Sequence, residues 1–294
     1  MDVKQIPKLL SLSDFPVGFG GCRNDQTAFE CCEYDVIVMD GQSGETVHRI
    51  QDDFVKVRHC SLDDSSSDTL YHLQDVSVIN DDQWKLRMLL SKIKEKKEQI
   101  TISYARSCLV DAGILANKAK DSVKIEDPFA GVWIKCAAYS LADAIFCLNV
   151  KRPSPTHMME IMRDMKTDKV NQKFSTIHQI LGIERSSTSL LSRMVKSTIG
   201  FSDMTENNGN SGIIQKKYEY FVKNSLLSDC YFYLGYVNRN NVLKIRNKIH
   251  KNPEFIHVLK VGLDIESDPM VVDNQAISLM QSINEILGDI KSQS

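Results

Sequence analysis

The sequence lacks any pair of cysteines in C-x-x-C spacing, although it contains eight cysteines among 294 residues. In a chain of this length, that pattern does not indicate a disulfide framework, and we expect a reducing, cytoplasmic location. One alternative stays open for these residues: Cys31 and Cys32, together with a distant histidine, could form a zinc site.

Two other absences bear on partners. The N-terminus has no apolar core of the kind found in signal peptides, and no uncharged apolar run approaches the roughly 20 residues that span a bilayer, so we expect no membrane partner. An excess of charge is also missing, because 38 acidic residues face 36 lysines and arginines, for a net charge of -2. The charge therefore gives no argument for a nucleic-acid partner.

What is present suits a folded protein: hydrophobic residues make up 42 % of the chain, and its length predicts two domains. The first hundred residues contain short β-like runs separated by turn-forming residues. These runs lie at Tyr34–Met39, Thr46–Ile50, Phe54–Cys60 and Val76–Ile79. Asn80-Asp81-Asp82 then predicts the start of a helix from about Gln83, because acidic and amide side chains cap helix N-termini.

From about residue 100 the pattern is helical almost throughout. A stripe of small and apolar residues from Trp133 to Leu148 predicts a helix that packs closely against its neighbours. Further periodic segments lie at 172–181, 186–199, 213–234, 238–250 and 274–291, and the clearest loop is 207–212.

The most informative stretch is Glu33-Tyr34-Asp35, at the start of an apolar run. If that run is a strand, Glu33 and Asp35 point to the same side. Two carboxylates held side by side repel, and a cation such as Mg²⁺ would relieve that repulsion. Upstream, Gly20-Gly21-Cys22 is a glycine pair at which backbone N–H groups could approach a phosphate.

The order of these features resembles the polymerase β-like nucleotidyltransferase superfamily, as a divergent or degenerate member. The family pattern is Gly-Gly or Gly-Ser, then an acidic-x-acidic pair on a strand about ten residues later. The resemblance implies an α+β fold, with a small mixed-sheet domain over residues 1–100 and an all-helical domain over residues 101–294.

The sequence departs from the family pattern at three points. Cys22 stands where the family has serine. The family's helix would occupy the interval between Gly21 and Glu33, but the small-residue pattern usual there is missing. A third carboxylate is not evident on the next strand, so Asp52 or Asp53 would have to supply it.

The chemistry implied by the resemblance is transfer of a nucleoside monophosphate from a nucleoside triphosphate to a hydroxyl acceptor. Glu33 and Asp35 would be the catalytic residues and the Mg²⁺ ligands. Gly20, Gly21, Cys22 and Arg23 would bind the triphosphate. Two alternatives stay open: a catalytically degenerate module of the same fold that binds a nucleotide or a protein, and a helical interaction protein.

Overall fold

The computed structural model describes residues 1–25, 27–149, 154–205, 209–266 and 268–292. Within these residues, five strands near the N-terminus form one mixed sheet in the order β3-β4-β2-β1-β5. The strands are β1 Val17–Gly20, β2 Tyr34–Val38, β3 Gly44–Ile50, β4 Asp53–His59 and β5 Ser77–Asn80. Strands β2 and β4 are parallel, and the other neighbouring pairs are antiparallel. A mixed sheet followed by helices confirms the predicted α+β class.

The two faces of the sheet differ because side chains alternate along each strand. One face is apolar: Val36 of β2 and Val57 of β4 pack there with Ile6 of the N-terminal helix α1 (Ile6–Leu9). The opposite face carries Asp35 and, directly across from it in the parallel ladder, Lys56. We call this second face the cleft face. The register therefore places charged side chains of two strands next to one another.

The described residues between Gly21 and Glu33 form turns, so the helix expected there is wrong. The backbone N–H of Asn24 donates to the carbonyl of Gly21 (3.0 Å), and that of Thr27 donates to the carbonyl of Cys22 (3.2 Å). The cysteines at both ends of the segment are buried, which anchors the turns at each end. Gly21 and Asn24 are residue types that favour turns over helix.

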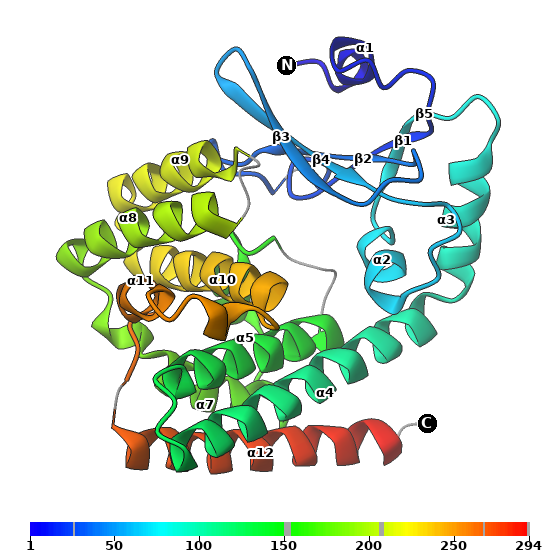
Figure 1. The fold of residues 1–294 in the computed structure, drawn as a ribbon. Helices are drawn as coiled ribbons and strands as arrows, with labels where there is room; N and C mark the ends of the chain where they lie inside the picture. Colours follow the sequence, from blue (N-terminus) through cyan, green and yellow to red (C-terminus); the bar gives the residue numbers. More distant parts are fainter. Residues whose placement is uncertain (26, 150–153, 206–208, 267, 293–294) are drawn as a thin grey trace.

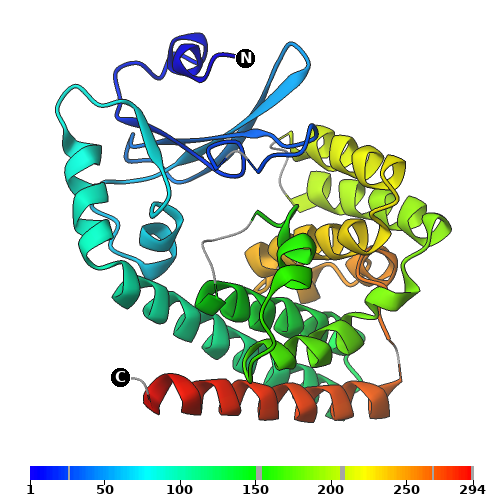
Figure 2. The same ribbon diagram turned by 180° about the vertical axis from the view of Figure 1, so that it is seen from behind.

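The rest of the structure is helical, apart from short connections. Its α-helices are α2 Ser67–His72, α3 Lys85–Glu95, α4 Lys97–Lys124, α5 Ala130–Asn149, α6 Met158–Asp164, α7 Phe174–Leu181, α8 Thr188–Thr205, α9 Asn210–Lys223, α10 Leu227–Ile245, α11 Phe255–Gly262 and α12 Pro269–Ser292. Single 3₁₀ turns occur at Val3–Gln5, Asn171–Lys173, Ile183–Arg185 and Ile249–Lys251. The sheet lies at one end of the molecule, and α4, α5 and α12 lie side by side at the other (Figures 1 and 2). Helix α4 runs without a break through residue 100, so the proposed division at that position stays a prediction.

Helix α5 is the centre of the helical core. Seventeen of its residues are buried, and its small side chains allow α4 to pack closely against it. Among the described residues, α5 is the one helix long and apolar enough to cross a membrane, and 94 % of its most apolar stretch is buried inside the protein. The apolar character of this helix is accounted for by the core that surrounds it.

Helix α9 connects the helical region to the sheet. The predicted continuous segment 213–234 is interrupted by Ser225, whose φ of 59° ends α9 and lets α10 begin. Residues 207 and 208 of the predicted loop lie outside the described residues, and Asn210 already belongs to α9. Gly212 faces Phe54 of β4 so closely that a Cβ would collide with the ring. This contact sets α9 against the edge of the sheet, where its lysines reach the strands.

Candidate functional site

The glycine pair and the carboxylate pair meet at the end of strand β1. Gly20 is the register partner of Asp35 on β2, and Gly21 turns the chain with a φ of +71°. A Cβ on Gly21 would collide with Asp35 Oδ2. Glycine is therefore required here both for the left-handed backbone and for the close approach of the turn to the carboxylate.

A cavity of about 930 Å³ lies between the cleft face of the sheet and the helices. Its lining includes Gly20, Gly21, Glu33 and Asp35, so both predicted carboxylates face the same space. Helix α10 contributes Tyr236 and Arg239, and α4 contributes Tyr104. In all, eight carboxylates line the cavity against four lysines and arginines, which makes this cleft acidic.

Glu33 is paired with a cation from the helical region. Lys217 of α9 places Nζ 2.6 Å from Glu33 Oε2, and the side chains are only 3 % and 11 % exposed. Burial disfavours the ammonium, but Glu33 holds the pKa of Lys217 well above its ordinary range. Lys217 does not stand out in the sequence, because the basic pair Lys216-Lys217 on a helix also fits a solvated face.

Asp35 differs from Glu33 because no hydrogen bond or ion pair to it is found among the described residues. Burial and the neighbouring Glu33 raise the pKa of Asp35 to about 7, although Lys56, Lys217 and Arg58 partly oppose that shift. Asp35 is therefore an uncompensated carboxylate, held next to a glycine turn and facing a cavity. Such a group favours a cation or a proton.

Strand β4 supplies cations where the family pattern places a third carboxylate. Lys56 and Arg58 each contact Glu45 of β3 at 2.8 Å. Although burial opposes ionisation, Lys56 and Arg58 hold the pKa of Glu45 well below its usual range. Glu45 faces the cavity, but these two cations already neutralise it.

The two carboxylates considered for the third position lie elsewhere. Asp52 is in the turn between β3 and β4, 3.9 Å from Arg49, with a fully exposed side chain. Asp53 begins β4 and lies 3.8 Å from Lys216 of α9. Neither is among the described residues that line the cleft.

Cys22 and Arg23 turn away from the cavity, unlike the glycines before them. The Arg23 guanidinium stacks over the Tyr34 ring at 4.3 Å, and its Nε donates to the carbonyl of Cys32 at 2.8 Å. Neither Cys22 nor Arg23 appears among the described lining residues. Of the four predicted phosphate-binding residues, the structure brings only Gly20 and Gly21 to the cleft.

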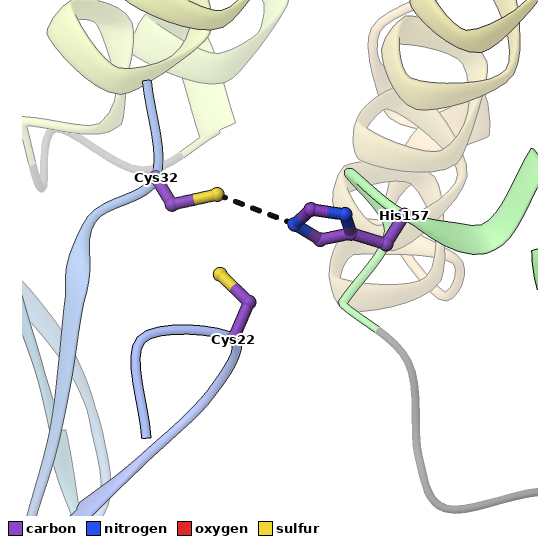
Figure 3. Close-up of side chains that lie close together, drawn as sticks. All are labelled: Cys22, Cys32 and His157. Atoms are coloured by element: carbon purple, nitrogen blue, oxygen red, sulfur yellow. Dashed lines mark hydrogen bonds between the residues drawn. The ribbon is translucent and has the colours of Figure 1, made fainter. Parts of the chain in front are cut away.

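Cys22 instead belongs to a buried cluster with Cys32 and His157 (Figure 3). Cys32 Sγ lies 3.4 Å from His157 Nε2, and one ligand atom from each of the three residues lies within 4.8 Å of the others. Hydrogen bonds from Cys22, Cys31 and His157 lower the pKa of Cys32. The same hydrogen bonding to Cys32, together with burial, raises the pKa of Cys22 and of Cys31. Cys32 is thus the hydrogen-bonding partner that the other members of the cluster have in common.

Comparisons with known proteins add little to this geometry. No protein-family model matches the chain, and no curated protein matches it. Among solved structures, the chain is similar to a nucleotidyltransferase-like protein from Exiguobacterium sibiricum 255-15, with 9 % sequence identity and a TM-score of 0.30. That alignment covers 87 % of this chain and 91 % of the other. At such a TM-score the similarity carries no argument about the site.

Proposed function

We propose that the cleft binds a nucleoside triphosphate together with Mg²⁺, and that the chain is a nucleotide-binding module of nucleotidyltransferase-like architecture. The observation that carries this proposal is Asp35, an unpaired carboxylate pressed against the Gly20-Gly21 turn in an open cavity. Backbone N–H groups of such a turn suit phosphate oxygens. Tyr104 and Tyr236 offer aromatic surface for a base or sugar.

The acidity of the cleft supports a requirement for the metal. A bare triphosphate would be repelled by eight lining carboxylates, whereas its Mg²⁺ complex carries less negative charge. Mg²⁺ in nucleotide sites is held by one or two carboxylates and by the phosphates themselves. Asp35 fits that role, with the second carboxylate supplied by Glu33.

The same residues fit a two-metal centre poorly. Glu33 is already neutralised by Lys217, and the position opposite Asp35 on β4 is a lysine. Two divalent ions need further anionic ligands. Among the described residues of the cleft, no other carboxylate shown next to Asp35 is free of a cationic partner. The cleft therefore supports nucleotide binding better than nucleotidyl transfer.

Transfer of a nucleoside monophosphate to a hydroxyl acceptor, with release of pyrophosphate, is the second candidate. It is favoured by the position of Asp35, which faces the same cavity beside the glycine turn, where a carboxylate could accept a proton from an attacking hydroxyl. The acceptor would enter the same cavity, which is large enough for a nucleotide and a further small group.

Thermal melting with Mg²⁺, with each nucleoside triphosphate, and with both together tests the proposal. We expect stabilisation only with both, by about 2.7 kcal/mol when the ligand is at a hundred times its dissociation constant. Asp35→Asn should abolish that shift. Asp52→Asn is the matched control, because Asp52 is exposed and outside the cleft, and it should leave the shift intact.

The outcomes separate the candidates. No shift with any nucleotide and Mg²⁺, or an equal loss in both variants, would refute nucleotide binding in this cleft. A shift without pyrophosphate release across a panel of hydroxyl acceptors supports the binding module. Pyrophosphate release that disappears in Asp35→Asn supports transfer.

A further inference from the structure

The cluster of Cys22, Cys32 and His157 lies outside the cleft and is not used by the proposed function. Its three side chains are buried, at 6 %, 1 % and 3 % exposure. They come from two distant parts of the chain: Cys22 and Cys32 flank the turns between β1 and β2, and His157 precedes helix α6. Figure 3 shows both sulfurs and the imidazole pointing toward one shared space.

The spacing of these atoms is that of metal ligands. In a tetrahedral zinc site, bonds of ~2.0–2.3 Å place neighbouring ligand atoms about 3.5–3.8 Å apart. Cys32 Sγ and His157 Nε2 are 3.4 Å apart, and no pair in the trio exceeds 4.8 Å. Small side-chain rotations would bring all three within reach of one ion.

A fourth donor is adjacent. Cys31 is buried, at 3 % exposure, and its thiol hydrogen-bonds with Cys32. Its sulfur is not among the three ligand atoms that lie within 4.8 Å of one another, so the Cys31 side chain would have to turn toward the other three residues to bind the same metal. Three thiols and one imidazole make a Cys₃His set, which is a structural zinc coordination.

The imidazole is held in the orientation that a metal needs. His157 Nδ1 lies 3.0 Å from Glu160 Oε2, so Nδ1–H donates to the carboxylate and Nε2 faces the sulfurs. Carboxylate–histidine–zinc arrangements fix the tautomer in this way. Phe29 packs against the ring, with centroids 4.2 Å apart, and restricts its rotation.

The charge around the cluster also suits a thiolate–metal centre. Zn²⁺ with three thiolates and a neutral imidazole carries one net negative charge. The ammonium of Lys217, buried beside Glu33, interacts electrostatically with each of the three thiols.

We propose that Cys22, Cys31, Cys32 and His157 bind one Zn²⁺ ion, which joins the turns of the sheet region to helix α6. Binding releases the thiol protons to solvent and involves no oxidation or reduction. Because Cys22 directly follows Gly21, the ion would also hold the glycine turn of the cleft in place.

Titration of the full-length, metal-free, reduced protein with Co²⁺ tests the proposal, since thiolate-to-cobalt charge-transfer bands and intense visible bands report a tetrahedral thiolate site. We expect saturation near one ion per chain and displacement of the bands by Zn²⁺. Cys22→Ser, Cys32→Ser and His157→Gln should lose the tetrahedral spectrum, and Cys31→Ser should weaken binding. Cys136→Ala, which removes a buried thiol of helix α5 outside the cluster, should leave the spectrum unchanged.

A variant that fails to fold would give no tetrahedral spectrum for a trivial reason, so Glu160→Gln provides a second test. Glu160 is half exposed, and its loss should leave the fold intact while it weakens zinc about 10–100-fold. Absence of a cobalt spectrum in the wild type, or zinc affinity that is unchanged in both His157→Gln and Glu160→Gln, would overturn the proposal.

Discussion

Two regions of the molecule each bury one lysine: the junction between the sheet and α9, and the core around α5. They accommodate the charge of that lysine in opposite ways. At the junction, Lys217 is matched by Glu33 at 2.6 Å. In the core, Lys135 donates to the carbonyl of Leu181 at 2.7 Å, and no carboxylate pairs with it among the described residues. The junction thus keeps its charges and pairs them, whereas the core favours the neutral form of its lysine.

This difference indicates where the protein uses buried charge. Burial lowers the pKa of Lys135 to about 7, so near neutral pH the core lysine is close to losing its proton. The junction instead gathers a salt bridge, a thiol cluster and an unpaired carboxylate around one short segment. Such concentrations of perturbed groups are typical of functional sites.

The largest effect is expected when the junction pair is broken. Lys217→Met leaves Glu33 buried without its cation, and the free energy of unfolding should fall by about 3–5 kcal/mol. Lys216→Met is the matched control on the same helix, because Lys216 reaches Asp53 only at 3.8 Å and both groups are partly exposed. That change should cost less than about 1 kcal/mol. Urea denaturation of both variants measures the difference, and equal losses would contradict the assignment.

The core lysine is expected to behave in the opposite way. Lys135→Met should raise the free energy of unfolding at pH 6 by up to about 5 kcal/mol, since the pKa falls from 10.5 to about 7 and each pKa unit corresponds to roughly 1.4 kcal/mol. The carbonyl of Leu181 stays satisfied, because the Tyr231 hydroxyl also donates to it at 2.6 Å.

The pH dependence fixes the sign of this prediction. The folded pKa of Lys135 is lowered, so between about pH 7 and its ordinary value of 10.5 the unfolded chain binds the extra proton. Wild-type stability therefore rises relative to the variant across that window, and the advantage of Lys135→Met shrinks as the pH approaches 10. An advantage that stays constant from pH 6 to 10 would show that lysine ionisation is not its cause.

The smallest effect on stability is expected when either of two glycines, Gly21 or Gly41, is replaced by alanine. Gly21→Ala and Gly41→Ala both place a side chain at positive φ, which costs about 1–2 kcal/mol. Only Gly21 would also press its Cβ against Asp35; Gly41 lines the same cleft, but nothing lies within 4 Å of the Cβ that it would gain. Gly21→Ala should therefore lose the nucleotide-dependent rise in melting temperature, and Gly41→Ala should keep it. If both variants keep the nucleotide-dependent rise in melting temperature, the glycine turn is not part of the binding site.

Much of the fold could be predicted from local patterns. The runs at 34–39, 46–50, 54–60 and 76–79 each correspond to a strand within one or two residues, because alternation and turn residues mark strands locally. Strand β1 was not identified, since Val17–Gly20 has glycine at two of its four positions and too little β-branched character to stand out. Helix α2 was also missed, because its acidic and serine-rich start is equally typical of a turn.

The candidate site was less accessible from sequence for a physical reason. Spacing along one strand could place Glu33 and Asp35 in the same cavity, because they are two residues apart. The partners of that segment come from α9 and from the start of α6, far along the chain, and no local pattern specifies such pairing. A zinc site with Cys31, Cys32 and a distant histidine was an open possibility, but neither Cys22 nor the identity of the histidine followed from the sequence.

The separation of Cys32 from His157 has a consequence during synthesis. The two residues lie 125 positions apart, so at about 5–20 residues per second the ribosome delivers the histidine roughly 6–25 s after the cysteine. Throughout that interval, three closely spaced thiols of the nascent chain have no imidazole to shield them. The nascent chain should therefore be more sensitive to oxidants than the folded protein.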